Sequence, residues 1–302
     1  MNDDTAIRAE GLTKDYGKGH GLFALDLEVR RGEVLGFLGP NGAGKSTTMR
    51  LLLDLIRPSA GSAAVLGLDS HAGSREIRRR VGFLPGDFAL YPKLSGADVL
   101  DHLAALRGGV DRRVRDGLVE RFGAQLDRPV HELSTGNRQK LGLVQAFMHE
   151  PELLILDEPI AGLDPLVQQR FHALLGEIAA EGRTVFLSSH TLSEVERVAD
   201  RVAILRNGRL VVIDSLERLR AIAIRRLEVE LGDGTGPSVE ELRALPGVRE
   251  ATRQGTRLDV AYEGSVDPLV KAMAKYEVRA LRSRDDDLEE IFLRYYRDGE
   301  DR

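Results

Sequence analysis

The 302-residue chain contains no cysteine. This absence excludes disulfide bonds, zinc sites built from thiolates and catalysis by a thiol nucleophile, and it fits a reducing compartment. Long hydrophobic runs are also missing, because stretches such as residues 51–53 and 153–156 are far shorter than the ~20 residues of a membrane-spanning helix. The first residues are acidic and no apolar stretch follows them, so we expect no secretory signal. The chain is therefore expected to stay in the cytoplasm without crossing a membrane.

The charge balance gives no reason to expect nucleic acid as a partner. The chain has 43 basic and 48 acidic residues, a net charge of -5, so it lacks a general electrostatic attraction to phosphate backbones. Its 42% hydrophobic and 30% charged residues are typical of a folded globular protein and exclude disorder as the main state. At ~150 residues per domain the length favours two domains, although one large domain is also allowed.

The first two thirds of the sequence predict a mainly parallel α/β core. Residues 34–38 form an apolar run typical of a buried strand, a glycine-rich turn follows, and residues 45–56 show helical spacing of leucines. The runs at 153–156 and 184–187 are each followed by a helical pattern as well, which favours repeated strand and helix units. Near the end of this part, Asn207-Gly208 predicts a tight hairpin because both residues tolerate positive φ angles.

The pattern changes near Leu227, and the remaining residues predict a second, smaller module. The expected order is β-α-β-β-α-β-α, which suggests a ferredoxin-like α+β fold. In its last helix, the residues Leu288, Ile291, Phe292 and Tyr295 follow helical spacing and predict one apolar face.

A phosphate-binding loop is predicted between the strand at 34–38 and the helix after it. Its glycines let successive backbone N–H groups turn toward phosphate oxygens, and the helix N-terminus adds positive potential. Lys45 is placed to reach the β and γ phosphates and Ser46 to ligate Mg²⁺. The alternative is a glycine-rich turn with a chance lysine. The expected nucleotide contacts of this loop are Gly39, Pro40, Asn41, Gly42, Ala43, Gly44, Lys45, Ser46 and Thr47.

Two acids directly follow the apolar run at 153–156. Ligands of open α/β sheets lie beyond the carboxyl ends of the strands, so Asp157 is expected to hold the magnesium shell and Glu158 to polarise an attacking water. The alternative is that the acids only cap a loop or helix. The phosphate-binding loop upstream favours the nucleotide site.

The segment Leu133-Ser134-Thr135-Gly136-Asn137 is similar to the signature motif of ATP-binding cassette (ABC) ATPases, whose consensus is Leu-Ser-Gly-Gly-Gln. The remaining motifs occur in the family's order, over about residues 7–220. Tyr16 matches the aromatic residue that stacks on adenine, residues 161–164 match the D-loop that ends in Asp164, and His190 matches the switch histidine. Alone, Tyr16 would be read as a packed loop residue and His190 as a solvated one.

The resemblance implies an α/β ABC ATPase P-loop nucleotide-binding fold for residues 1–222, with a helical signature subdomain at about 87–150. Residues 223–302 are expected to form the accessory α+β module. It further implies ATP hydrolysis with ATP and Mg²⁺, catalysed by Glu158 and His190, with Ser46 and Asp157 as metal ligands. Ser134 and Gly136 are expected to meet the γ-phosphate of ATP held by the opposite subunit.

The C-terminal module resembles that of drug-resistance-type exporter ATPases. This implies a homodimer at the cytoplasmic face of the membrane, peripherally bound to a separate integral membrane ABC permease of the type-2 exporter class. The alternative is a soluble ABC-type ATP switch that acts on ribosomes or DNA without transport. Two features argue against this alternative: the chain has room for only one cassette, and it shows no sustained heptad repeat of the kind that forms a coiled coil.

Three positions depart from the family pattern. Gly86 stands where the family usually has Gln, whose side chain touches magnesium and the transmembrane partner. Thr135 and Asn137 replace Gly and Gln of the signature. Both keep hydrogen-bonding side chains, so we expect altered geometry and retained binding.

Overall fold

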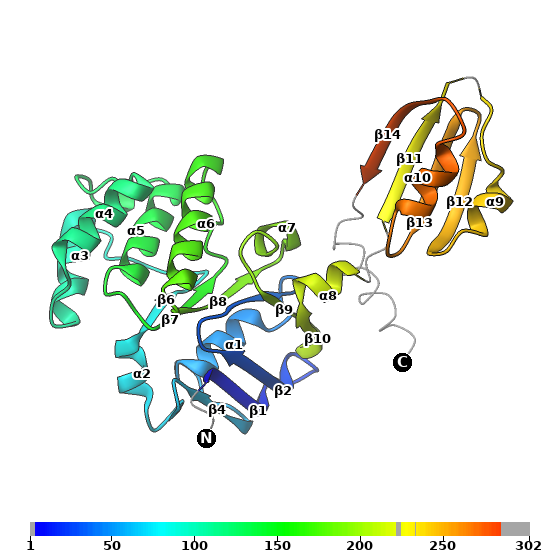
Figure 1. Cartoon of the computed structure of the whole chain (residues 1–302). Helices are drawn as coiled ribbons and strands as arrows, with labels where there is room; N and C mark the ends of the chain where they lie inside the picture. The colour runs from blue at the N-terminus through cyan, green and yellow to red at the C-terminus, as the bar shows by residue number, and fades with distance from the viewer. Residues whose placement is uncertain (1–3, 222–224, 233, 285–302) are drawn as a thin grey trace. The chain divides into compact units, whose positions relative to one another are not determined.

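The computed structural model describes residues 4–221, 225–232 and 234–284. The chain divides into two compact units, residues 1–213 and 214–302 (Figure 1). The boundary expected from the sequence, between residues 222 and 223, stays a prediction.

Two sheets form the frame of the first unit. One is antiparallel with the strand order β2-β1-β4-β5, and the other has the order β10-β9-β3-β8-β7-β6 with parallel pairing from β9 to β6. This parallel sheet confirms the expected α/β core. The strands are β1 (Thr5–Asp15), β2 (Gly21–Arg30), β3 (Val34–Leu38), β4 (Ala60–Val65), β5 (Leu68–Asp69), β6 (Val81–Leu84), β7 (Leu153–Asp157), β8 (Thr184–Ser189), β9 (Arg201–Arg206) and β10 (Arg209–Ser215).

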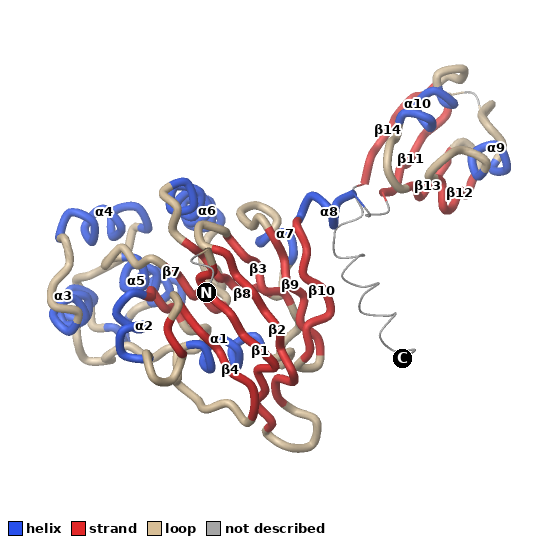
Figure 2. Tube along the Cα trace, turned by 60° about the horizontal axis from the view of Figure 1, so that its bottom comes forward, coloured by secondary structure: helices blue, strands red, loops and turns tan. Residues whose placement is uncertain are grey.

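Helices separate the successive parallel strands in the chain, and α3, α4 and α5 gather at the end of this unit away from β9 and β10 (Figure 2). The helix after the glycine-rich loop is shorter than the predicted 45–56, because Asp54 takes a left-handed backbone (φ 55°) that ends it. The helices are α1 (Lys45–Leu52), α2 (Ser74–Arg80), α3 (Gly96–Leu106), α4 (Arg112–Phe122), a 3-10 turn η1 (Val130–Glu132), α5 (Thr135–Phe147), α6 (Pro165–Ala180) and α7 (Leu192–Val195). The next helix, α8 (Leu216–Ala221), falls within the second unit.

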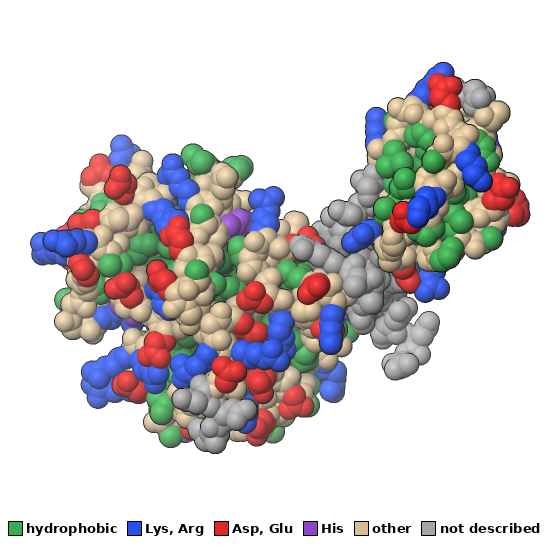
Figure 3. Space-filling model, viewed as in Figure 1, with side chains coloured by type: hydrophobic (Ala, Val, Ile, Leu, Met, Phe, Trp, Pro, Cys, Tyr) green, Lys and Arg blue, Asp and Glu red, His purple; other side chains and the backbone are tan. Residues whose placement is uncertain are grey.

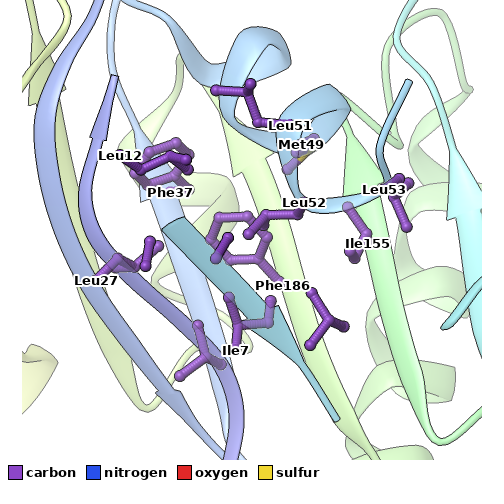
Figure 4. Close-up of a cluster of buried hydrophobic side chains, with 14 of the residues drawn as sticks. Ile7, Leu12, Leu27, Phe37, Met49, Leu51, Leu52, Leu53, Ile155 and Phe186 are labelled. Carbon is purple, nitrogen blue, oxygen red and sulfur yellow. The ribbon is translucent and has the colours of Figure 1, made fainter. Parts of the chain in front are cut away.

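A buried apolar cluster lies between the two sheets around α1 (Figure 4). Ile7 of β1 and Met49 of α1 are fully buried there, and the rings of Phe37 and Phe186 from neighbouring strands are 5.1 Å apart. Every residue of β3, β7 and β8 is buried, which is the reason for their continuous apolar runs. This packing fixes the strand ends from which the functional loops emerge.

The turn between β9 and β10 confirms the predicted hairpin. Asn207 and Gly208 have φ angles of 47° and 72°, as a type I′ turn requires, and the two strands are neighbours in the sheet.

The second unit contains a four-stranded antiparallel sheet with the order β12-β13-β11-β14. In chain order this is 2-3-1-4 of a βαββαβ unit, which confirms the ferredoxin-like prediction. Leu227, Val229 and Val260 lie in its own buried cluster. The predicted apolar face of Leu288 to Tyr295 lies outside the described residues. The elements are β11 (Arg225–Leu231), α9 (Val239–Arg243), β12 (Val248–Gln254), β13 (Arg257–Tyr262), α10 (Asp267–Met273) and β14 (Val278–Arg284).

Within the described ranges, no helix combines the length and the apolar character that crossing a membrane requires.

Candidate nucleotide site

The loops after β3 and β7 meet at a cavity of about 260 Å³. Ten of its lining residues were predicted from the sequence. His20 and Gly21, where the chain turns from β1 into β2, were not predicted. Their closeness to Tyr16 in the sequence could have indicated that they line the same cavity. The complete lining is Tyr16, His20, Gly21, Pro40, Asn41, Gly42, Gly44, Lys45, Ser46, Thr47, Asp157 and Glu158.

Two glycines of the loop are required for different reasons. A Cβ atom at Gly39 would lie 2.5 Å from the Leu205 carbonyl oxygen, so no side chain fits there. Gly44 has φ 110°, a backbone conformation that side chains rarely allow. Together they let the chain turn sharply from β3 into α1, whose first N–H groups have no partner within the helix. This is a suitable place for an anion.

Lys45 is buried, with its side chain only 6% exposed. Its Nζ donates to the carbonyl oxygens of Gly39 (2.6 Å) and Pro40 (3.4 Å) and lies 3.3 Å from Glu158 Oε1. The ammonium group is thus held at the cavity wall by the loop's own backbone.

Asp157 and Glu158 share one hydroxyl group, that of Ser188 on the neighbouring parallel strand. Ser188 Oγ donates to Asp157 Oδ1 (2.6 Å) and accepts from the backbone N–H of Glu158 (3.0 Å). Asp157 and Ser188 are paired in the register of β7 and β8. Ser188 was not among the residues predicted for the site. The available signal was its place directly after the apolar run at 184–187, which matches the place of Asp157 after the run at 153–156.

His190 follows β8 and reaches the second acid. Its Nδ1 lies 2.8 Å from Glu158 Oε2, a hydrogen bond in which the ring nitrogen donates. His190 is 56% exposed, while Glu158 is 21% exposed and has φ 49°. The structure therefore brings together Lys45 from the start of α1, Glu158 from directly after β7 and His190 from directly after β8.

The predicted metal ligands, Ser46 and Asp157, line the same cavity. A hydroxyl and a carboxylate oxygen are the donors that Mg²⁺ prefers, and Mg²⁺ usually completes its shell with phosphate oxygens and water. Asp157 Oδ2 faces Gly86, where an added Cβ would lie only 3.2 Å away. The residues present fit a nucleotide-bound magnesium ion.

The remaining predicted residues lie outside the lining of this cavity. Ser134 caps α5 by accepting from the Asn137 N–H (3.2 Å). Asp164 caps α6 by accepting from the Val167 N–H (3.0 Å), and this bond lowers the pKa of Asp164. Ala43 is buried.

Asn137 of the signature segment faces inward. Its side chain accepts from the Gln125 N–H (2.9 Å) and donates to the Gln125 carbonyl oxygen (3.2 Å), and it is only 6% exposed. It therefore joins the start of α5 to the segment after α4, and both polar atoms of its side chain are used in these two hydrogen bonds. Of the two departures from the consensus, only Thr135 leaves its side chain exposed.

Residues 22–161 match the protein family described as ABC transporter. The bacitracin transport ATP-binding protein BcrA of Enterococcus faecalis is 36% identical over 231 residues, which are 76% of this chain and 75% of BcrA. The chain belongs to the ABC transporter family. A solved ATP-binding subunit of an ABC transporter is similar to it with a TM-score of 0.65 and 32% identity, covering 72% of this chain and 92% of that one.

The dimeric ATP-binding cassette MJ0796, in a post-hydrolysis state with ADP and Pi, shares the fold with a TM-score of 0.64 at 22% identity, covering 70% of this chain and 98% of that one. These findings confirm the ABC ATPase fold of the first unit. They also confirm the predicted class of activity: the chain is an ATP-binding, ATP-hydrolysing subunit of an ABC transporter.

Proposed function

We propose that this chain is the ATP-hydrolysing subunit of an exporter, acting as a homodimer on a separate integral membrane permease at the cytoplasmic face of the membrane. The observation that carries the proposal is the convergence of Lys45, Ser46, Asp157 and Glu158 on one cavity. Such an arrangement suits phosphoryl transfer, which depends on positioning and electrostatic stabilisation.

In this proposal each residue of the cavity has a separate task. Tyr16, which is 58% exposed at the rim, stacks on the adenine. The N–H groups at the start of α1 and Lys45 bind the phosphates. Ser46 and Asp157 would hold Mg²⁺, which would neutralise phosphate charge. Glu158 accepts a hydrogen bond from the attacking water, and His190 fixes the orientation of the Glu158 carboxylate.

The proposal requires a dimer because the signature residues are not part of the cavity. Ser134 and Gly136 stand at the N-terminus of α5, where an anion is favoured, but they do not line the cavity formed by their own chain. A second subunit facing this one places its signature on the phosphates, as the family resemblance implies. Asp164, at the start of α6, is proposed to lie at the same contact between subunits.

A second cavity supports docking to a permease. It measures about 510 Å³, and its largely apolar wall includes Pro85, Phe88, Ala89 and Tyr91, which flank Gly86 in the sequence. In the family, the residue at the position of Gly86 touches the transmembrane partner. The surface between α2 and α3, whose residues Arg78 and Leu103 line this cavity, is hollowed in Figure 3. We infer that a segment of the permease binds here.

Export is favoured over import by relatives whose names describe drug or bacitracin transport, such as BcrA. The type-2 exporter class rests on the resemblance of the C-terminal module. The alternative, a soluble ATP switch, is not favoured, because the relatives are transport proteins.

The hydrolysis part is tested with the purified full chain. Mg²⁺-dependent ATP turnover is expected in the wild type, and Lys45→Ala should abolish ATP binding. A wild-type chain that binds ATP but releases no phosphate with Mg²⁺ would overturn it.

The permease part is tested by co-expression with an ABC permease that lacks its own ATP-binding subunit. A stable complex is expected, and Phe88→Asp in the second cavity should break it. The matched variant Val211→Asp, an exposed position on β10 outside both cavities, should leave it intact.

A further inference from the structure

The first turns of α5 lie directly against the loop that follows β7. The side-chain amide of Gln139 donates to the carbonyl oxygens of Pro159 (2.8 Å) and, more weakly, Glu158 (3.4 Å). One turn earlier, a Cβ atom at Gly136 would lie 2.8 Å from the Gly162 carbonyl oxygen. The signature helix and the loop carrying Glu158 therefore touch within one chain.

The peptide unit of Glu158 is held from both sides. Its N–H donates to Ser188 Oγ (3.0 Å), and the carbonyls at Glu158 and Pro159 face the Gln139 amide. Glu158 has φ 49°, a conformation that is uncommon for a residue with a side chain and persists only where the surroundings fix it. Gln139 is 8% exposed, so water has little access to replace its amide.

We propose that Gln139 is a positioning residue for ATP hydrolysis, whose amide fixes the backbone at Glu158 and so aims the carboxylate at the attacking water. This inference rests on the role proposed for Glu158 above. Gln139 stands on α5, whose N-terminus carries Ser134 and Gly136. When the nucleotide of the partner subunit binds at this N-terminus, the effect is therefore transmitted through Gln139 to Glu158 of the same chain.

Gln139 does not line the nucleotide cavity. Its loss therefore changes the orientation of Glu158 and leaves the ATP-binding surface intact. A residue that acts this way lowers kcat without weakening ATP binding, and its effect disappears once Glu158 can no longer act as a base.

The test compares Gln139→Met with wild type, since methionine keeps the length and helix preference of glutamine but cannot donate. The matched control is Gln168→Met, because Gln168 on α6 makes the same kind of bond to the Leu163 carbonyl oxygen (3.0 Å) in the same loop. Both substitutions are also made in the Glu158→Gln background. ATP turnover, the dissociation constant for ATP and the thermal unfolding midpoint are measured for each full-length protein.

We expect Gln139→Met to lower kcat about tenfold with the ATP dissociation constant within about twofold of wild type, and Gln168→Met to change kcat less than about twofold. In the Glu158→Gln background, Gln139→Met should change the residual turnover by less than about twofold. If Gln139→Met does not fold, Gln139→Ala replaces it, because alanine adds no atoms and favours the helix.

An equal loss in both backgrounds, or a fall in ATP affinity that accounts for the lost activity, overturns the inference. If the Glu158→Gln single variant keeps wild-type turnover, the proposed role of Glu158 fails first, and the inference fails with it. If Glu158→Gln is inactive but Gln139→Met is as active as wild type, only the role of Gln139 is wrong.

Discussion

Lys45 Nζ lies 3.3 Å from Glu158 Oε1, so the lysine proposed to bind phosphates is paired with the carboxylate proposed to activate water. Both side chains are largely shielded from solvent, which strengthens their attraction. The phosphates of ATP must compete with this carboxylate for the ammonium group. Binding and hydrolysis are thereby linked through one ion pair.

Glu158→Gln should separate the two steps. We expect ATP turnover to fall by about 10² to 10⁴, the usual contribution of a positioned base, and ATP to bind about three- to tenfold more tightly because Lys45 loses its competing anion. Phosphate release and calorimetric titration with ATP measure these effects. Glu120→Gln, which removes the same charge from an exposed site on α4, is the control. Turnover within about threefold of wild type would show that the base is another residue.

Mixed dimers test whether the site is shared between subunits. Ser134→Asp keeps a good helix cap but places a carboxylate where the γ-phosphate is expected, whereas any side chain at Gly136 would also push against Gly162. An equal mixture of Lys45→Ala and Ser134→Asp subunits should recover about a quarter of wild-type turnover, since half of the dimers are mixed and each has one intact site. Dimers that form without any recovery would contradict sharing.

The space beside Asp157 can be tested at Gly86. Its backbone does not need a glycine, but an added Cβ would lie 3.2 Å from Asp157 Oδ2, so the carboxylate must shift by a few tenths of an ångström. Gly86→Ala adds only this crowding and should lower turnover about threefold. Gly86→Gln also restores the amide that the family usually has, and it should exceed Gly86→Ala in turnover and need less Mg²⁺ for half of its maximal rate. Equal behaviour of the two variants would mean that the amide contributes nothing.

His149 should make stability depend on pH. Burial, and to a smaller extent the charge of Arg107, lowers the pKa of His149 to about 4 from its usual 6.5. The unfolded chain therefore binds a proton between pH 6.5 and 4 that the folded chain does not, and the free energy of unfolding falls as pH falls through this window. The ring is partly exposed, so we expect a loss of about 1–2 kcal/mol.

Chemical denaturation at pH 7 and pH 4.5 measures the effect. His149→Gln should lose less stability between these values than wild type does. The exposed His102→Gln should behave like wild type. Parallel losses in all three proteins would assign the pH dependence to other groups.

Truncation tests the two-unit organisation. The buried cluster around α1 and the cluster around Leu227 share no residue. Deleting residues 227–302 should therefore leave a folded protein that binds ATP with a dissociation constant within about threefold of the full chain. Gel filtration and ATP titration decide the outcome, and an aggregated or non-binding product would contradict independence of the first unit.

The phosphate-binding loop could be predicted from the sequence because its glycines and Lys45 follow one another in the chain, between an apolar run and a helical pattern. The positive φ of Gly44 is a local constraint, whereas the crowding of Gly39 by Leu205 is a long-range contact that the sequence does not show. The strands at 34–38 and 153–156 were predictable from continuous apolar runs, which reflect burial on both faces. Contacts of residues far apart in the sequence were not. The pairing of Asp157 with Ser188 depends on strand register, and the inward turn of Asn137 depends on the position of Gln125. No local pattern encodes either.

The paired hydrogen bonds between Asn137 and Gln125 join the first turn of α5 to the segment after α4, so the two helices should tilt as one body. A reporter on α4 would then register displacement of the signature without touching it. At Gly117 of α4, an added Cβ meets no atom within 4 Å, and the chain has no cysteine of its own. A single thiol introduced by Gly117→Cys would carry one fluorophore at a defined place, and its emission would follow the movement of the signature helix during turnover.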